Sequence, residues 1–174
     1  MFEINDYVVH NTMGVNRITE LIEETVNGET VEFFILEPAF GGNMRLKLPT
    51  AGCEDKMRAV LTRDEVDELI SSIPEQESIW IDEDKIRYEE FRACLKTGIC
   101  ENWVALIKTL NAKKEERANI GKQLTRVDAD VLKSAEKNLT TELAIVLDID
   151  PDAVLPYIFE QLPDGTSMLE SETA

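Results

Sequence analysis

Residues 27–36 read Asn-Gly-Glu-Thr-Val-Glu-Phe-Phe-Ile-Leu, and this stretch decides the fold of the first third of the chain. The pair Asn27-Gly28 favours a tight type I′ hairpin turn, because both central residues of such a turn need a positive φ. The following residues, 31–36, are rich in aromatic and β-branched side chains, which pack well on a pleated sheet. The stretch therefore predicts the turn and the return strand of a β-hairpin.

Further short strands are predicted on both sides of this hairpin. In residues 44–48, apolar side chains at 44, 46 and 48 alternate with Arg45 and Lys47, as in a strand with two different faces. Strands are also expected at residues 7–9, 15–22 and 57–61. Five short strands joined by Gly, Asn and Pro turns are typical of a small β-barrel of the SH3 or Tudor type.

After residue 61 the apolar pattern changes to a helical period. Thr62 and Glu65 have the spacing of a capping box at a helix start. Further helices are expected at residues 84–97, at 101–119, after a Thr125 cap and after Asp150-Pro151. Pro156 is expected to break or kink the last one early. The polar linker at residues 74–78 marks the expected domain boundary.

The predicted fold class is therefore α+β: an N-terminal Tudor/SH3-like β-barrel followed by an all-helical C-terminal domain. We expect the barrel domain at residues 1–73 and the helical domain at residues 79–162. The acidic segment at residues 163–174 is expected to be disordered.

Composition narrows the class of protein. The chain has 174 residues and a formal net charge of −17, with 43% hydrophobic residues. No apolar run approaches the ~20 residues that a membrane helix needs, and the N-terminus does not resemble a signal peptide, which predicts a cytoplasmic protein without a membrane partner. Residues 105–140 carry eight bases and five acids, so the chain has one mildly basic stretch where a nucleic acid could bind.

The motifs of common enzymes are missing from the sequence. There is one histidine, His10, with no serine or cysteine motif beside it, and there is no phosphate-binding glycine loop. The three cysteines include no Cys-x-x-Cys pair, so we expect neither a zinc site nor a disulfide framework. We therefore expect no enzymatic activity, no cofactor, no metal and no small-molecule substrate.

Two features stand out in the helical part. Trp80, just before the first helix of that domain, is either a packing residue or an apolar wedge against a DNA base step. Basic residues gather around one helix end, at Lys108, Lys113, Lys114, Arg117, Lys122 and Arg126. Such a run is either a solvated face or a set of phosphate contacts.

The order of these segments resembles the CarD family, which shares its start with the RNA-polymerase-interacting domain of transcription-repair coupling factors. The resemblance spans about residues 1–147 and rests on an ordered set of segments: the opening residues 2–9, Met13-Gly14-Val15, Leu48-Pro49, residues 57–60, Trp80 ahead of Arg87-Tyr88, residues 95–98, 104–110, 113–117 and 135–144.

This resemblance implies a bacterial transcription regulator that binds the RNA polymerase β subunit and modulates the stability of the promoter open complex. Its predicted polymerase-binding residues are Arg45, Lys47, Leu48 and Pro49. The acid Glu24 stands where some members of the family carry a base.

The resemblance also implies that promoter DNA is contacted within the polymerase complex, with Trp80 against the minor groove. The predicted DNA-binding residues are Trp80, Lys85, Arg87, Lys113, Lys114 and Arg117. The acids at residues 82–84 would face phosphates unfavourably. The alternative is an acidic interaction adaptor that binds polymerase or another protein without contacting DNA.

Overall fold

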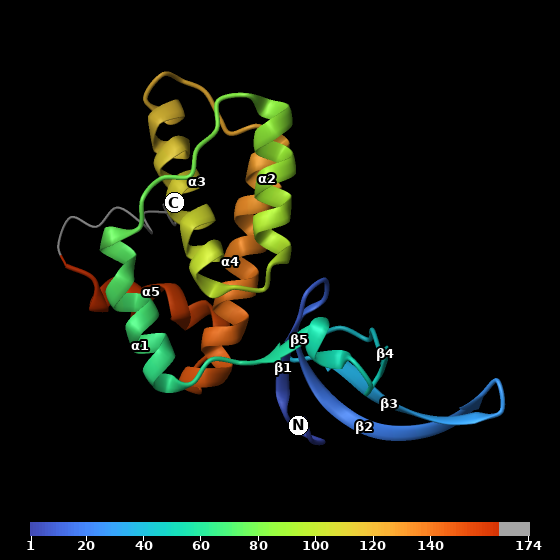
Figure 1. Ribbon diagram of the computed structural model, residues 1–174. Coiled ribbons are helices and arrows are strands. Elements are labelled where there is room, and N and C mark those ends of the chain that lie inside the picture. The colour runs from blue at the N-terminus through green and yellow to red at the C-terminus, as the bar shows by residue number, and fades with distance from the viewer. Residues whose placement is uncertain (164–174) are drawn as a thin grey trace. The chain divides into compact units, whose positions relative to one another are not determined.

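The computed structural model describes residues 1–163 and divides into two compact units, Met1–Val60 and Leu61–Ala174 (Figure 1). The first unit is built of strands and the second of helices, so the α+β class is confirmed. Apart from Pro163, the acidic segment expected at residues 163–174 lies outside the described residues.

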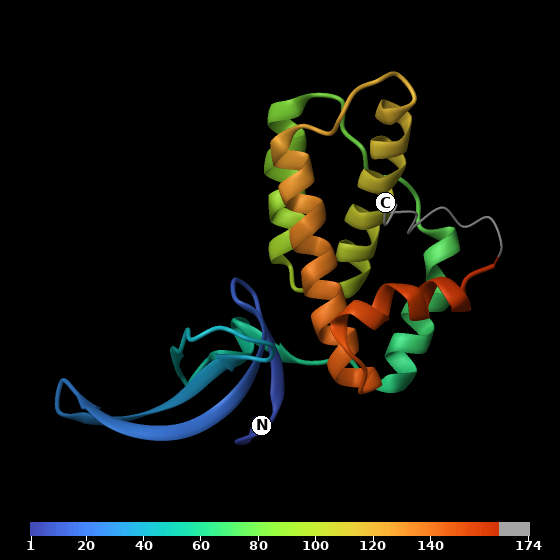
Figure 2. The same cartoon turned by 180° about the vertical axis from the view of Figure 1, so that it is seen from behind.

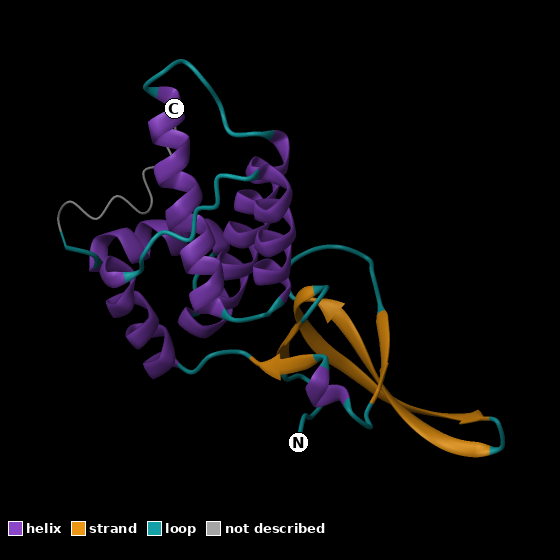
Figure 3. Cartoon of the chain, turned by 45° about the horizontal axis from the view of Figure 1, so that its top comes forward, coloured by secondary structure: helices purple, strands orange, loops and turns teal. Residues whose placement is uncertain are grey.

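The first unit is a five-stranded antiparallel sheet in the order β4-β3-β2-β1-β5 (Figure 3). Its strands are β1 (Tyr7–His10), β2 (Gly14–Val26), β3 (Glu29–Pro38), β4 (Leu46–Pro49) and β5 (Met57–Ala59). A short 3₁₀ turn, η1 (Cys53–Asp55), connects the last two. Among the described residues β4 and β5 are the two edges of the sheet and share no ladder, so the closed Tudor-like barrel stays a prediction.

The hairpin that opens the sequence analysis is confirmed. Asn27 and Gly28 have φ values of 53° and 85°, as a tight turn with two positive φ angles requires. Both strands are longer than expected, and the ladder runs from Asn16↔Pro38 to Val26↔Glu29. Since β1 pairs only with residues 14–17 of β2 and β4 only with residues 33–36 of β3, the far part of the hairpin is a two-stranded ribbon.

The strand predicted at residues 44–48 is shorter than expected. It begins at Leu46, opposite Leu36 of β3, and the exposed Met44 lies in the preceding loop. The predicted alternation holds for Leu46, Lys47 and Leu48, whereas Arg45 lies just outside the strand. The core of this unit lies on one side of the sheet and comprises Val8, Ile18, Phe34, Leu36, Leu48, Cys53 and Met57, with Phe2 and Leu46 packed against it.

The described residues of the second unit form five α-helices: α1 (Arg63–Ser72), α2 (Asp84–Lys96), α3 (Cys100–Ala118), α4 (Arg126–Leu147) and α5 (Pro151–Gln161). Helix α4 contacts each of the other four, and α5 crosses its C-terminal end (Figure 2). No helix in the described part of the chain has the length and hydrophobicity needed to cross a bilayer.

The helix starts agree with the sequence signals. Thr62 and Glu65 form the complete capping box, and the side chains of Thr125 and Asp150 cap α4 and α5. Pro156 does not break the last helix, because α5 continues through it to Gln161. The buried side chains of Val154 and Ile158 hold that helix on α4 despite the lost backbone donor.

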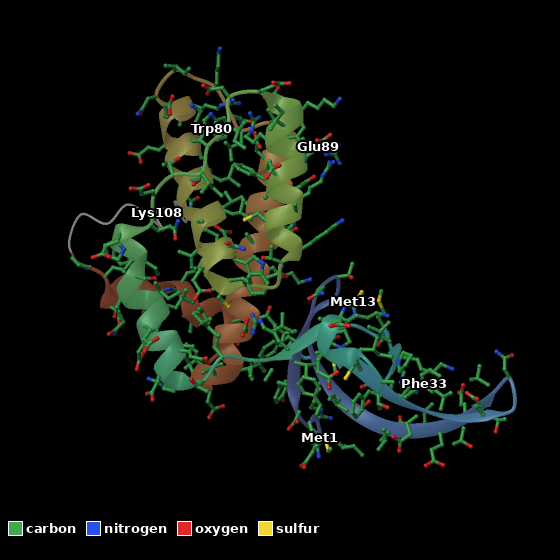
Figure 4. The ribbon with its side chains drawn as sticks, in the orientation of Figure 1. Met1, Met13, Phe33, Trp80, Glu89 and Lys108 are labelled. Atoms are coloured by element: carbon green, nitrogen blue, oxygen red, sulfur yellow. The ribbon has the colours of Figure 1, made fainter. Side chains whose placement is uncertain are left out.

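The two units divide between Val60 and Leu61, whereas we expected the boundary at residues 74–78. Leu61 donates its backbone N–H to the buried carboxylate of Glu142 on α4 at 2.9 Å, so the chain joins the helical unit before α1 begins. The Lys108 ammonium donates to the carbonyl oxygens of residues 73, 74 and 76 at 2.9, 3.0 and 2.8 Å. Figure 4 labels Lys108 on α3, beside the end of α1. Since this lysine fixes the expected linker to α3, that segment is part of the helical unit.

Candidate functional site

The residues predicted to bind polymerase lie at the β4 edge of the sheet. We call Arg45, Lys47 and Pro49, with the outer face of β3 beside them, the strand surface. Leu48 is not available on it, because its side chain is 4% exposed and belongs to the core. Within a strand the neighbours of a core residue point to the opposite face, which places Lys47 and Pro49 outward.

The Lys47 ammonium is held by two neighbours on the outer face. Its Nζ lies 2.7 Å from Oε2 of Glu24 on β2 and 4.8 Å from the centre of the Phe33 ring on β3. The side chains of Lys47 and Glu24 are 45% and 43% exposed, so water screens the ion pair and it contributes about 1 kcal/mol or less. The pair is weak enough for a binding partner to displace it.

Arg45 is bound in a similar way. Its guanidinium forms ion pairs with Glu20 on β2 and with Glu37 on β3, the latter at 3.1 Å, and all three side chains are about half exposed. Two of the acids that face the strand surface, Glu20 and Glu24, are therefore paired to the bases predicted to bind polymerase. The strand surface is close to neutral rather than basic.

An apolar strip lies between these charges, and the sequence analysis did not single it out. Ile22 on β2 is directly opposite Phe33 on β3, and Ile35 follows Phe33 on the same face (Figure 4). Ile35 is 8% exposed, and the other two are half-buried. The sequence did contain a signal, because residues 33–36 are all apolar. A strand with apolar side chains on both faces needs another element or a binding partner to cover each face.

In the helical unit Trp80 lies between α2 and α3 (Figure 4) and is half-buried. The Arg87 guanidinium stacks on its ring, with Cζ 4.2 Å from the ring centre. The Phe91 ring packs edge-on against it, with the two ring centres 6.3 Å apart and the ring planes at 69°. The indole Nε1–H donates to Oδ1 of Asp82 at 2.9 Å. Trp80 is thus held in one orientation with part of its surface open to solvent.

Two more cations flank the same ring. Nζ of Lys113 lies 4.7 Å and Cζ of Arg117 lies 5.8 Å from the ring centre, one helical turn apart on α3. Lys113 also pairs with Glu116 at 3.0 Å, and Arg117 donates to the backbone carbonyl of Gln123 at 3.3 Å. We call Trp80, Asp82, Arg87, Lys113 and Arg117 the Trp80 cluster.

Arg87 was predicted to contact DNA, and its environment argues against that role. The side chain is fully buried, and its Nε and Nη2 donate to the two carboxylate oxygens of Asp128 on α4 at 3.0 and 2.9 Å. Nη2 also donates to Asp84, and Nη1 donates to the carbonyl of Ile81 at 2.9 Å. Burial alone would lower the pKa of Arg87, but the hydrogen bonds to Asp128 and Asp84 outweigh it and raise the pKa. Arg87 therefore holds the Trp80 ring in position by stacking against one of its faces.

The other predicted DNA contacts are not all in the Trp80 cluster. Lys85 is exposed on the first turn of α2, and Lys114 is exposed on a different face of α3 from Lys113. Neither is within ring-contact distance of Trp80 in the described structure, whereas Lys113 and Arg117 are. The structure thus brings Trp80, Arg87, Lys113 and Arg117 together and leaves Lys85 and Lys114 outside.

The acids before α2 are partly neutralised within the unit. Asp82 accepts a hydrogen bond from the Trp80 indole, and Asp84 forms an ion pair with Arg87 at 2.7 Å. The exposed Glu83 forms no ion pair with another described residue. The sequence analysis missed Asp128, whose carboxylate accepts from Arg87 and from the hydroxyl of Thr125, and whose backbone N–H donates to the same hydroxyl oxygen. A signal existed, because an acid three residues after a Thr cap has the spacing of a capping box.

Comparison with known families concerns the sheet unit. Residues 2–61 match the model of the CarD-like/TRCF RID domain, a segment that contains all five strands and ends where the two units divide. No curated protein matches the chain. A domain of this description is a protein-interaction domain that binds RNA polymerase. Residues 2–61 are therefore similar to the CarD-like/TRCF RID domain.

Proposed function

We propose that this chain is a bacterial transcription regulator that binds the RNA polymerase β subunit through the strand surface and modulates the stability of the promoter open complex. The observation that carries the proposal is the family match over residues 2–61, within which the edge strand β4 leaves one side of its backbone unpaired among the described residues. An edge strand can add a partner strand by backbone hydrogen bonding.

The strand surface supplies what such a contact needs besides the backbone. Phe33 and Ile35 offer apolar area next to β4, and an apolar centre with a charged rim is usual in protein interfaces. Lys47 and Arg45 form that rim. A polymerase carboxylate would have to compete with Glu24 for Lys47, so the contact depends on exchange of one exposed ion pair for another.

The helical unit would act on DNA only after the sheet unit has bound polymerase. A chain with a net charge of −17 is repelled by duplex DNA at long range, so free DNA is a poor ligand. Tethering raises the effective concentration of Trp80, Lys113 and Arg117 at the promoter. Contacts made only when the DNA is open would shift the promoter equilibrium toward the open complex.

A second candidate function is an acidic adaptor that binds polymerase or another protein and makes no DNA contact. The observation in its favour is the position of Asp82, whose carboxylate occupies the indole Nε1–H of Trp80. A negative charge at this edge of the ring opposes the approach of phosphates. The two functions differ in whether promoter DNA lies next to Trp80 in the polymerase complex.

One experiment tests both parts. A photo-crosslinking amino acid is placed at Glu83, which is exposed beside Trp80, and at Lys96, exposed at the far end of α2, as the matched control. The proposal predicts that the full chain captures the β subunit in a pull-down and that, in promoter complexes, DNA crosslinks from position 83 exceed those from position 96. Capture without DNA crosslinks would establish the adaptor, and failure to capture the β subunit would overturn the polymerase assignment.

A further inference from the structure

A hollow that belongs to neither of the surfaces described so far lies between the C-terminal end of α3 and the first half of α4. Its volume is about 380 Å³, which is within the range of small-molecule sites. Its apolar lining consists of Ala118 on α3, Leu124 in the α3–α4 loop, and Ala129 and Leu132 on α4. Burying apolar surface of this kind under an apolar group is favourable in free energy, because it removes the surface from water.

Three lysines line the same hollow: Lys114, Lys122 and Lys133. All three are exposed, and none forms an ion pair with another described residue. The three ammonium groups are therefore positioned to receive a negative charge from outside the described structure.

The described lining contains one carboxylate, Glu136 on α4. Burial raises its pKa, although Lys114 and the Asn111 side chain oppose the rise. With three lysines and one glutamate, the hollow carries a local charge of +2 on a protein whose net charge is −17. An anion is therefore attracted to this place more than to the rest of the surface.

The wall formed by the α3–α4 loop is fixed by the chain itself. The backbone N–H of Lys122 donates to the carbonyl of Arg117 at 2.8 Å, and the Arg117 guanidinium donates to the carbonyl of Gln123 at 3.3 Å. Gly121 takes a positive φ of 72°, which lets the chain turn back at the end of α3. Because these contacts hold the wall in place, the hollow exists before any ligand arrives and binding would not need to order the loop.

We infer that this hollow binds a small organic anion whose apolar body rests on Ala118, Leu124, Ala129 and Leu132 and whose acidic group is held by Lys114, Lys122 and Lys133. A bare inorganic anion would leave the apolar lining in contact with water. A neutral apolar molecule would leave the three ammonium groups without a partner. The site is independent of the proposed polymerase contact, because none of its lining residues belongs to the strand surface or to the Trp80 cluster.

Binding is measured on the full chain with 1-anilinonaphthalene-8-sulfonate, a fluorescent anion with an apolar aromatic body. Decanoate and decanol, which share a chain length and differ in charge, serve as competitors. We expect a single probe site per chain, displaced by decanoate at a concentration at least about tenfold below that of decanol, since decanoate alone carries a charge that three lysines can bind.

Three variants locate the site. Lys133→Glu should weaken probe binding at least about fivefold, whereas Lys137→Glu, the same charge change one turn further along α4 and outside the lining, should change it less than about twofold. Ala129→Phe fills the hollow without changing the charge and should weaken binding at least about tenfold. Circular dichroism and thermal unfolding confirm that each variant remains folded.

Several outcomes would overturn the inference. Equal effects of Lys133→Glu and Lys137→Glu would show a general charge effect instead of a site. Displacement by decanol as effective as that by decanoate would show adsorption to apolar surface only. A chain ending at Pro163 that binds the probe at least about tenfold more tightly than the full chain would assign the hollow to the chain's own residues 164–174, which include Met168-Leu169 and three acids.

Discussion

Arg87 on α2 and Asp128 on α4 form a fully buried ion pair joined by two hydrogen bonds of 3.0 and 2.9 Å, and the Trp80 ring rests on the guanidinium of this pair. The arrangement connects the stability of the helical unit to the orientation of the half-buried Trp80 ring. A guanidinium that is paired on its edges can still offer its flat face to a ring.

Asp128→Asn should destabilise the helical unit by about 3 kcal/mol or more, because it removes the only fully buried carboxylate among the described partners of the buried Arg87 charge. Urea unfolding followed by tryptophan fluorescence measures this loss. The emission of Trp80 should also shift to the red in the folded variant. Asp130→Asn, an exposed position two residues further on α4, is the control and should change stability by less than about 0.5 kcal/mol. Similar losses for the two variants would contradict the central role of the pair.

Lys47→Glu should weaken binding to the polymerase β subunit by at least about 1 kcal/mol, or roughly fivefold, because a positive rim charge becomes repulsive. Glu24→Gln, which releases Lys47 from its internal partner, should leave binding unchanged or strengthen it. The double variant Lys47→Glu with Glu24→Lys restores an internal ion pair but not the contact. Calorimetric titration measures the affinity of each variant for the β subunit. If the double variant recovers the wild-type affinity, Lys47 acts only through its ion pair within the sheet and does not contact polymerase.

Trp80→Ala should shorten the lifetime of the open promoter complex while affinity for polymerase stays unchanged, because the indole lies in the helical unit and the proposed docking surface in the sheet unit. Lifetimes follow from competitor challenge of preformed complexes. Phe159→Ala removes an exposed aromatic residue from α5 and should have no effect. Tight binding of the wild-type chain to free DNA at physiological salt would refute the tethering argument.

The stability of the β1–β2 turn should depend on His10. Its Nδ1 accepts from the backbone N–H groups of Thr12 and Met13, both at 3.2 Å, so the ring must be unprotonated there. Burial lowers the pKa of His10 below 6.5, and Lys56 adds to the effect. Below about pH 6.5 the unfolded chain therefore binds the proton more readily than the folded one.

It follows that this contribution is complete above about pH 7 and is lost as the pH falls through the ordinary histidine value, by at most about 1.4 kcal/mol per pH unit. Amide hydrogen exchange at Thr12 and Met13, compared at about pH 7.5 and about pH 5.5, measures it. The difference between wild type and His10→Gln isolates the histidine from other titrating groups. Equal pH dependence in both proteins would contradict the prediction.

Local signals in the sequence predicted local structure well. The Asn27-Gly28 turn and the caps at Thr62, Thr125 and Asp150 are determined by residues within a few positions of one another, and all four are observed. The shared face of Leu46 and Leu48 was predictable for the same reason, because it depends only on alternation.

Long-range pairing was not predictable in this way. Arginine is normally a surface residue, and Arg87 is buried because Asp128, 41 positions away, compensates its charge. Lys108 was assigned to a basic run, whereas its partners are carbonyl groups more than 30 positions away. Similarly, no local pattern shows that Glu24 and Glu20 lie across the sheet from Lys47 and Arg45.

The hydrogen bonds from Lys108 to the carbonyls of residues 73, 74 and 76 determine where this chain can be cut and fused to another protein. The family match ends at residue 61, and residues 61–76 are bonded to the helical unit through Glu142 and Lys108. A chimera joined at residue 60 would transfer the sheet as a complete module with its core intact. A chimera joined within residues 74–78 would separate α1 from α4, on which it packs, and would expose buried side chains in both products. The first 60 residues are therefore the part of the molecule that can be transferred as a unit.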